Sequence, residues 1–259
     1  MFYFMKRLTG QTLRAIGIIV MLALAARASA QSFVGGGNGP TFDTRPAVTV
    51  ADHSGEAGGR VIVDIIDGAG MLTKTTDSNG SDNGANGPFG QMGLFRGHTH
   101  DNPGTVVGSN WGRFEFDQVY PLTNLWIWNW NELTPSAGNN TRFGWKHITV
   151  QYSTTGGPLA SEWTTADLLL GSAGDNLVAQ SDGAFGSAPD LVAPFKSSGA
   201  PVLAKYVVLT NTGVGPEITW GGDDGAGDAG LSEVRFQVPE PASLGLLSIG
   251  GLAVLRRKR

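Results

Sequence analysis

The sequence predicts an all-β fold, a single antiparallel β-sandwich or jelly roll, between two apolar terminal segments. Three observations predict it. The chain between the ends consists of short β-branched or alternating runs bounded by Gly, Asn, Asp and Pro. No long stretch there has the apolar spacing of a helix. Glycine accounts for 39 residues without a collagen-like period, which favours many turns between short strands.

The N-terminal segment, residues 1–30, has the three parts of a helical secretory signal peptide. Its start is basic, with Lys6, Arg7 and Arg14. Residues 15–26 are apolar, and this run of about 12 residues suits a signal helix but is short for a membrane span. Ala28-Ser29-Ala30 has the small residues of a cleavage site, so we expect the mature protein to begin at Gln31. The alternative is an uncleaved membrane anchor.

The central region divides into a lead-in and a sandwich. Residues 31–46 are rich in Gly and aperiodic, and we expect a flexible lead-in. Residues 47–237 form the predicted sandwich. Its clearest strand candidates are residues 47–50, 61–66, 113–119, 122–130, 147–153, 204–210 and 231–238, and the weaker ones are 166–170 and 177–180. Residues 73–102 are rich in Gly, Asn, Asp and Ser, and we expect a long loop there on one face.

Charge and cysteine content limit the function. The two ends hold eight of the 18 Lys and Arg residues and one of the 22 Asp and Glu residues. The remainder therefore has 10 basic and 21 acidic residues, a net charge of −11. Such an acidic surface repels nucleic acids and anionic lipids, so we expect no nucleic-acid partner. There is no cysteine, so stability must come from core burial, with or without a metal.

The C-terminal segment, residues 238–259, has three parts in a fixed order. Pro239-Glu240-Pro241 is followed by the apolar residues 242–255 and then by a basic end. The basic residues are Arg256, Arg257, Lys258 and Arg259. The apolar run is short for a stable span, and its basic end is expected to stay on the cytoplasmic side. The alternative is an ordinary C-terminal membrane anchor.

This order of parts resembles the PEP-CTERM sorting signal of Gram-negative bacteria, with a short helical tail. The resemblance implies recognition by an exosortase-type membrane protease and removal of the tail after transient anchoring in the inner membrane. It also implies a final location at the cell surface or in an extracellular, exopolysaccharide-containing matrix.

The central region resembles the discoidin-like, galactose-binding-like jelly roll. Residues 66–68 (Ile-Asp-Gly) occupy the place of an early turn of that family, and residues 111–117 match its Trp-then-alternating strand. Residues 148–163 resemble its Tyr-Ser…Gly…Trp hairpin, although no Asp precedes the glycines here. Residues 204–209 and 231–236 match its last two strands. The resemblance implies a β-sandwich that binds glycans.

Calcium is the expected cofactor. Asp64 and Asp67 lie in an early strand-to-turn segment, and Glu233 lies on the predicted final strand, which can be close to the first strand in a jelly roll. Carboxylate and carbonyl oxygens are the ligands that Ca²⁺ prefers. The family resemblance implies a structural Ca²⁺ at Asp67 with Glu233 as a ligand. The alternative is that Asp67 only caps an Asp-Gly turn. The acidic segment 223–228 lacks the order of a calcium-binding loop and is expected to be a solvated turn.

Histidine-based catalysis is not expected. His98 and His100 alternate as two ligands of one metal ion would, but a catalytic zinc needs three protein ligands. His53 and His147 have no partner at motif spacing. No nucleophile elbow, phosphate-binding loop or dinucleotide fingerprint occurs. We therefore expect a protein that is not an enzyme.

Aromatic residues are the candidate ligand contacts. Trp126, Trp128 and Trp130 share one face of a predicted strand, and either this face or the Leu125–Ile127 face is the core. Packing is the commoner role for such indoles, and sugar stacking is the alternative. The other predicted rim residues lie near strand ends or loops and provide stacking faces and hydrogen-bond donors: Trp111, Trp145, Trp220, Arg142, His98 and His100.

These observations predict an exported, non-catalytic surface or matrix protein that binds a glycan. The alternatives are a purely structural surface protein without a small ligand, and a metal-dependent or carboxylate hydrolase.

Overall fold

We describe the chain from a computed structural model. It describes residues 32–34, 48–56, 62–66, 93–95, 100–101, 107–108, 110–130, 133–134, 138–139, 141–168, 177–181, 188–213, 215–221 and 228–239. The chain forms two compact units, of which the second is Phe33–Val238. Nearly all described residues belong to this second unit. The predicted signal peptide, and the predicted tail beyond Pro239, lie outside the described residues.

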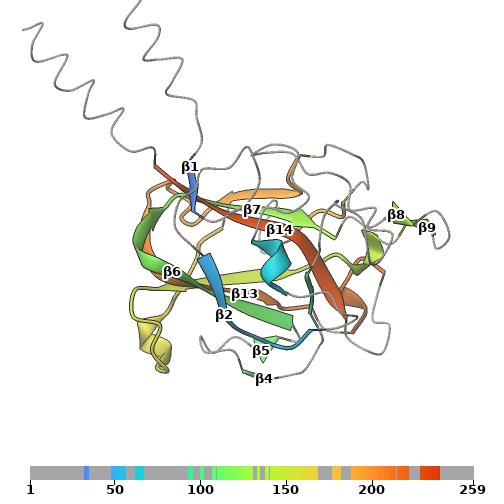
Figure 1. The fold of residues 1–259 in the computed structure, drawn as a ribbon, viewed down its shortest axis with the longest axis horizontal. Helices are drawn as coiled ribbons and strands as arrows, with labels where there is room; N and C mark the ends of the chain where they lie inside the picture. The colour runs from blue at the N-terminus through green and yellow to red at the C-terminus, as the bar shows by residue number, and fades with distance from the viewer. Residues whose placement is uncertain are drawn as a thin grey trace, which may run out of the picture. The chain divides into compact units, whose positions relative to one another are not determined.

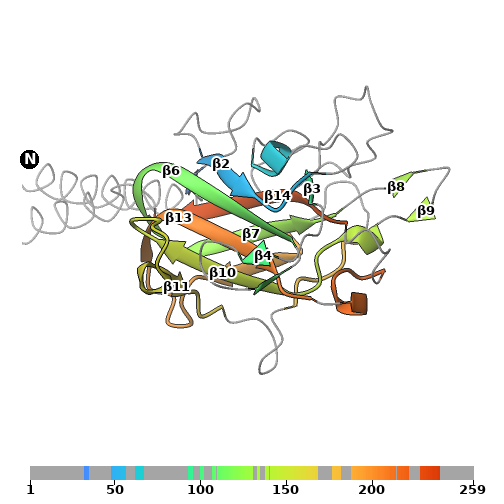
Figure 2. The same cartoon turned by 90° about the horizontal axis from the view of Figure 1, so that it is seen from below.

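Two five-stranded β-sheets make up most of the second unit. Figures 1 and 2 show them as two layers. The first sheet has the order β1-β14-β7-β12, with β3 also paired to β14. Its strands are β1 (Ser32–Val34), β3 (Gly93–Phe95), β7 (Asn124–Asn129), β12 (Leu191–Pro194) and β14 (Ala229–Val238). The second sheet has the order β11-β10-β13-β6-β2. Its strands are β2 (Val48–His53), β6 (Asn110–Leu122), β10 (Ile148–Ser153), β11 (Thr164–Thr165) and β13 (Val202–Asn211).

The remaining described elements are short. Two hairpins of two-residue strands pair β4 (His100–Asp101) with β5 (Val107–Gly108), and β8 (Leu133–Thr134) with β9 (Gly138–Asn139). The 3₁₀ turns are η1 (Ile62–Ile65), η2 (Thr141–Phe143), η3 (Ala160–Glu162) and η4 (Gly215–Glu217). No helix in the described part of the chain has the length and hydropathy that a membrane span requires.

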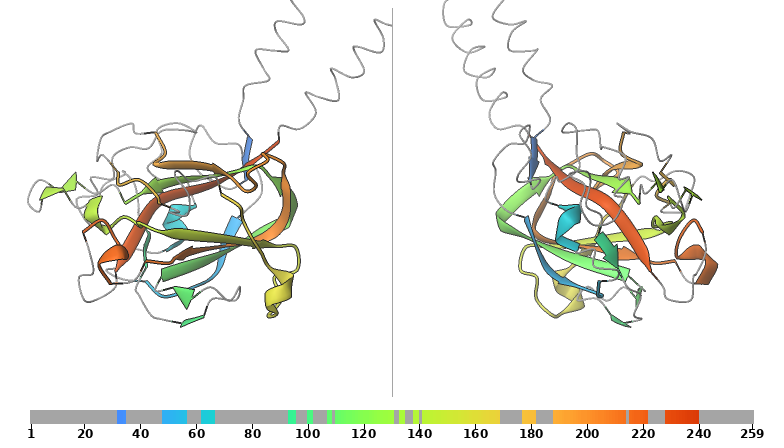
Figure 3. Two further views of the ribbon diagram at one scale, coloured as in Figure 1. Left: turned by 180° about the vertical axis from the view of Figure 1, so that it is seen from behind. Right: turned by 45° about the vertical axis from the view of Figure 1, so that its right-hand side comes forward.

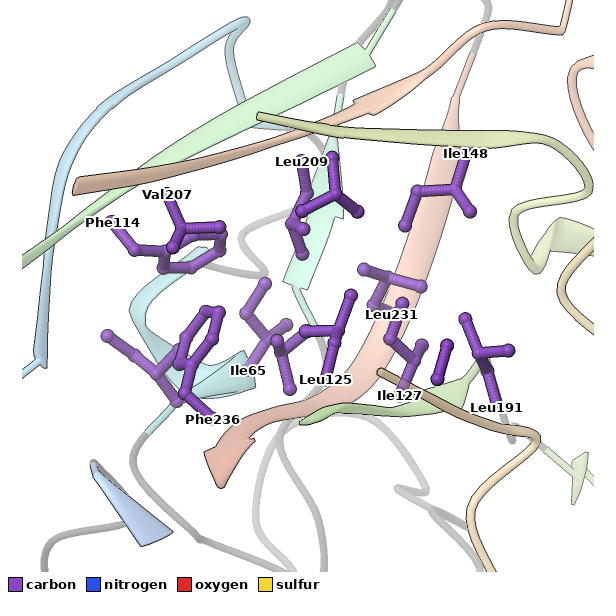
Figure 4. Close-up of a cluster of buried hydrophobic side chains, with 14 of the residues drawn as sticks. Ile65, Phe114, Leu125, Ile127, Ile148, Leu191, Val207, Leu209, Leu231 and Phe236 are labelled. Atoms are coloured by element: carbon purple, nitrogen blue, oxygen red, sulfur yellow. The ribbon is translucent and has the colours of Figure 1, made fainter. Parts of the chain in front are cut away.

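The core lies between the two sheets, whose layers are seen from two further sides in Figure 3. Strand alternation directs every second side chain inward, so β6 contributes Phe114 and Phe116, and both rings contact Phe236 of β14. Figure 4 shows the aliphatic side chains that surround this aromatic contact. They include Ile65, Leu125, Ile127, Ile148, Leu191, Val207, Leu209 and Leu231, all buried. Each contributes roughly 1.5–3 kcal/mol of burial free energy.

The predicted all-β, two-sheet fold is confirmed. The strands predicted at residues 47–50, 113–119, 122–130, 147–153, 204–210 and 231–238 correspond to β2, β6, β7, β10, β13 and β14. Every pairing among these strands is antiparallel, with bulges where the register shifts. A bulge between Leu231 and Glu233 in β14 keeps Val234 and Phe236 inside and turns Glu233 and Arg235 outward.

The strand predicted at residues 61–66 is wrong. Residues 62–65 form the 3₁₀ turn η1, and Ile62 and Ile65 are both fully buried. A 3₁₀ turn superimposes residues three apart, so this geometry buries both isoleucines on one side. The Glu56 carboxylate accepts a hydrogen bond from the Ile62 amide at 2.8 Å and holds the start of the turn.

Other boundaries also differ from the prediction. Ser32–Val34, placed in the flexible lead-in, forms β1 and buries Phe33 and Val34. The strand β12 was not predicted. Residues 166–168 form no strand, and Leu177 makes only an isolated bridge with His147. Within the predicted loop 73–102, the structure describes the short strands β3 and β4.

Candidate functional site

The three indoles of the predicted strand are all buried, and Trp126 and Trp128 belong to a cluster separate from the core between the sheets. Leu125 and Ile127 of β7 are fully buried in the core between the sheets. Trp126 is 7% exposed, and Trp128 and Trp130 are fully buried. The core face is therefore the Leu125–Ile127 face, so the interpretation that the indoles pack inside the sandwich core is wrong, although all three indoles are buried.

A short strand and a buried ion pair cover two of these indoles. Phe33 of β1 contacts Trp126 edge-on, with ring centroids 5.2 Å apart. The Arg235 guanidinium carbon lies 5.8 Å from the ring centroids of both Phe33 and Trp128. Arg235 Nε donates a hydrogen bond of 3.1 Å to Glu233 Oε1, and both side chains are 1% exposed. We call Phe33, Trp126, Trp128, Glu233 and Arg235 the indole cluster.

The ion pair of the indole cluster does not fit a calcium site. Burial lowers the pKa of Arg235 from its ordinary value, while attraction to Glu233 opposes that change. Arginine nevertheless stays protonated in proteins. A second cation at Glu233 would lie beside this buried guanidinium, where like-charge repulsion is strong. Glu233 is therefore an ion-pair partner here and not a suitable Ca²⁺ ligand.

The other predicted metal and histidine residues are Asp64, Asp67, His98 and His100. The backbone of Asp64 lies in η1 and that of His100 in β4, where His100 pairs with Gly108. Their side chains, together with Asp67 and His98, lie outside the described residues. Within the described ranges, no group of three or more His, Cys, Asp or Glu side chains is arranged to hold a metal ion. Calcium at Asp67 stays a prediction.

Two of the predicted rim tryptophans are buried, which corrects their assignment. Trp111 is 5% exposed and Trp145 is fully buried. Trp111 lies in β6, which begins at Asn110, and its amide donates to Ser54 Oγ at 3.1 Å. Trp145 makes an isolated antiparallel bridge with Thr219. The backbone pairing thus extends past the predicted strand ends and encloses both indoles.

Two further predicted rim residues, Arg142 and Trp220, lie on segments that are side by side. The Gly221 amide donates a hydrogen bond of 2.9 Å to the Arg142 carbonyl. A Cβ on Gly221 would lie 2.7 Å from Arg142 Cβ, so glycine allows this close approach. Trp220 is half-buried, and its Nε1 donates to the Val178 carbonyl at 3.1 Å. Segments far apart in the sequence therefore meet here.

Two pairs of a cation and an aromatic ring lie on this surface. Lys146 Nζ lies 5.4 Å from the centroid of the Trp220 ring, and the exposed Arg142 guanidinium lies 5.0 Å from that of Phe143. Phe143 and Trp220 are both half-buried. We call Arg142, Phe143, Lys146, His147, Glu217 and Trp220 the end surface.

Glu217 organises the charges of the end surface. Its Oε2 pairs with Lys146 Nζ and lies 3.1 Å from His147 Nε2. The hydrogen bond with Lys146, followed by that with His147, lowers the pKa of Glu217 from its ordinary value. The carboxylate side chain is 49% exposed, so this pairing occurs in contact with water.

Asn129 of β7 fastens the end surface to the first sheet. Its Nδ2 donates to the Trp145 and Ala179 carbonyls, each at 2.8 Å. A Cβ on Gly144 would lie 2.6 Å from Asn129 Oδ1, so glycine is needed for this contact. Phe143, Lys146, Glu217 and Asn129 were not identified from the sequence. The adjacent aromatic and basic residues at 142–147 are the only local signal for them.

A third group of aromatic and cationic side chains has a structural role. Arg113 of β6 lies 4.7 Å from the Tyr206 ring centroid and 5.6 Å from that of Trp163. Its Nη2 donates to the Gly156 carbonyl at 3.0 Å, and Gly156 has a φ of 65°. The Trp163 indole in turn donates to the Gly157 carbonyl at 2.9 Å. These contacts hold the loop after β10 against the second sheet.

Tyr206 also joins a polar chain on the same sheet. Its hydroxyl donates to Glu115 Oε1 at 3.0 Å, and Lys205 Nζ lies 3.2 Å from the same oxygen. These two hydrogen bonds, Tyr206 first, lower the pKa of Glu115. Tyr206 and Lys205 therefore both pair with the Glu115 carboxylate on this sheet.

Comparison with known proteins identifies the C-terminal segment. A family model described as the PEP-CTERM protein-sorting motif matches residues 237–259. No curated protein matches the chain. Several solved structures are similar in fold at low identity. CBM32-3 from a family 31 glycoside hydrolase of Clostridium perfringens is 14% identical, with a TM-score of 0.40, and the match covers 74% of this chain and 90% of that chain.

Two further structures have similar scores. The family 32 carbohydrate-binding module of NanJ from C. perfringens, in complex with galactose, is 11% identical with a TM-score of 0.40, covering 80% of this chain and 99% of that chain. A pectin binding carbohydrate-binding module is 16% identical with a TM-score of 0.38, covering 75% of this chain and 91% of that chain. The motif match confirms the predicted sorting tail, and this protein is a two-sheet, all-β domain followed by a PEP-CTERM protein-sorting motif.

Proposed function

We propose that this protein is exported, sorted by its C-terminal motif, and binds a glycan through the end surface. The observation that carries the binding role is the arrangement of Trp220 with Lys146 and Arg142. The half-buried Trp220 indole is held by its own hydrogen bond and flanked by the Lys146 cation, while the backbone carbonyl of the exposed Arg142 accepts a hydrogen bond from Gly221, the residue after Trp220.

The chemistry of the end surface suits a sugar. A sugar ring has apolar C–H faces that pack on an indole or phenyl ring, and hydroxyls that accept hydrogen bonds from Arg142 or Lys146. Trp220 and Phe143 provide partly exposed rings, and the first of these is fixed before a ligand arrives. Preformed geometry lowers the entropy cost of binding.

The cellular part of the proposal follows from the motif. We propose that an exosortase-type membrane protease removes the tail, and that the domain acts at the cell surface or in the extracellular matrix of a Gram-negative bacterium. Deleting residues 239–259 should leave a folded domain and change its location. Unchanged location and unchanged processed mass in the native host would refute this part.

A glycan array with residues 31–238 tests the binding role. We expect binding that falls about tenfold or more, equivalent to 1.4 kcal/mol, in Trp220→Ala and Arg142→Ala. The control is Lys196→Ala, which removes an exposed cation from the turn after β12 and should not alter binding. If the wild-type domain binds no glycan, it has a structural role, and if it cleaves one, the non-catalytic part of the proposal is wrong.

A further inference from the structure

The last strand of the domain runs directly into the sorting motif. The motif match begins at Gln237, whereas β14 ends at Val238. Pro239 is therefore the first residue after the strand, and it begins the Pro-Glu-Pro tripeptide. No spacer separates the folded domain from the tripeptide.

The two residues shared by the strand and the motif are firmly integrated in the fold. Gln237 Oε1 accepts hydrogen bonds from Asn124 Nδ2 at 2.7 Å and from Trp126 Nε1 at 3.1 Å. The Gln237 carbonyl accepts from the Thr123 amide at 2.8 Å and from its hydroxyl at 3.2 Å. Val238 is 8% exposed and belongs to the hydrophobic core. Releasing this strand end would break all of these contacts.

The position of β14 in the sheet further restricts access. It lies between β1 and β7, so both of its edges are paired (Figure 1). Extended peptides are commonly bound through main-chain hydrogen bonds along one edge. Where β14 pairs with β1, β3 and β7, those groups are already used within the sheet, and they become available only when the strand opens locally.

We propose that the folded end of β14 sets the N-terminal limit of sorting cleavage. The cut peptide bond lies on the C-terminal side of Val238, and the missing spacer slows access to it. This inference rests on the proposed processing of the tail. The step is a hydrolysis in which the C–N bond breaks, water supplies the hydroxyl of the new carboxyl group, and its other proton goes to the amine of the released tail.

The test uses the full chain in a host that has the sorting system, with pulse-chase labelling and intact mass of the product. One variant carries a Gly-Ser-Gly-Ser spacer between Val238 and Pro239. The control carries the same spacer between Gly199 and Ala200, in an exposed turn where a Cβ on Gly199 would meet no neighbouring atom within 4 Å. Melting curves of all products check that the domain stays folded.

We expect the wild-type product to end at Val238 or later, and the product of the first variant to retain its spacer. Processing of that variant should be at least about threefold faster, because local opening no longer limits cleavage. The control should match the wild type. A product that ends before Val238, or equal rates in the two spacer variants, overturns the inference while leaving sorting intact. Absence of processing in every chain refutes the sorting proposal and this inference with it.

Discussion

The indole cluster and the end surface combine the same kinds of side chain with opposite exposure. In the indole cluster, an arginine, a glutamate and two tryptophans are almost completely buried. In the end surface, Arg142 is exposed, Glu217 is 49% exposed and Trp220 is half-buried. Aromatic rings lie beside cations in both regions, at centroid distances between 5.0 and 5.8 Å.

The difference comes from what lies over each region. Phe33 of β1 packs on the indole cluster, and the Arg235–Glu233 pair compensates two charges without help from water. The end surface is built from loop segments joined by isolated bridges and by Asn129, and Glu217 pairs with its cations in contact with solvent. Residue types alone therefore do not distinguish a packing site from a binding site. The cover decides.

The largest expected effect concerns the buried pair. Glu233→Ala removes the carboxylate and leaves the Arg235 charge buried, which should lower the free energy of unfolding by about 3–5 kcal/mol. Replacing both residues, as in Glu233→Leu with Arg235→Met, should cost less because no unpaired charge remains. Urea denaturation of the purified domain measures both.

The matched control for the buried pair is Glu217→Ala on the end surface. Its carboxylate is half exposed, and exposed ion pairs contribute little to stability, so the denaturation midpoint should hardly move. Equal losses for the two glutamates would show that the contrast between the regions is wrong.

The next prediction concerns calcium binding. We propose calcium at Asp67 alone, because Glu233 is engaged with Arg235. A ligand that binds only the folded state at a hundredfold excess over Kd stabilises it by about 2.7 kcal/mol. For a domain of this size, that should raise the Tm by roughly 5 °C or more.

Calorimetry with calcium and with chelator measures this shift. Asp67→Ala should abolish the calcium response, whereas Asp224→Ala and Glu233→Gln should retain it. Superimposable wild-type melting curves with and without calcium would mean that Asp67 is only a turn residue.

A smaller effect tests how the first sheet supports the end surface. Asn129→Ala leaves the buried Trp145 carbonyl and the Ala179 carbonyl without their amide donor, and should cost roughly 1–3 kcal/mol. It should also weaken glycan binding, because both segments are released. Ser232→Ala is the control, since it removes the hydrogen bond to the Asn129 carbonyl but leaves the Asn129 side-chain amide in place. Denaturation and glycan titration of both variants measure these two effects. Full glycan affinity in Asn129→Ala would contradict the coupling.

The sequence predicted features that depend on neighbours along the chain. Alternation in β7 correctly placed Leu125 and Ile127 on one face and the indoles on the other. The cover over Trp126 and Trp128 comes from Phe33 and Arg235, which are distant in sequence. No local pattern reports such contacts, so the burial of the outer face was beyond prediction by periodicity.

The same reason explains the partial success at the candidate site. Arg142 and Trp220 were identified by residue type, and the structure brings them together through Gly221. Trp111 and Trp145 have the same residue type but lie under paired backbone. In η1, a short apolar run fits a strand or a helical turn equally well, and only its packing selects the turn.

The smallest effect is a titration that contrasts the exposed pair with the buried one. The pKa of Glu217 lies below its ordinary value of 4.5, chiefly because of the hydrogen bond with Lys146 and secondarily because of that with His147. A carboxyl group whose pKa is lowered by folding stabilises the folded state above its unfolded pKa. That contribution is lost as the pH falls through the lowered value, so the Lys146–Glu217 contact should persist at neutral pH and disappear only below about pH 4.5.

Lys146→Ala should raise the pKa of Glu217 toward the ordinary value, and His147→Ala should raise it less. Added salt should reduce the difference between Lys146→Ala and the wild type, because exposed charges are screened. Carboxyl chemical shifts measured by NMR across acidic pH report each value. If Lys146→Ala leaves the pKa of Glu217 unchanged, the ammonium group above Trp220 is not held by this carboxylate, and the end surface is less preformed than its contacts indicate.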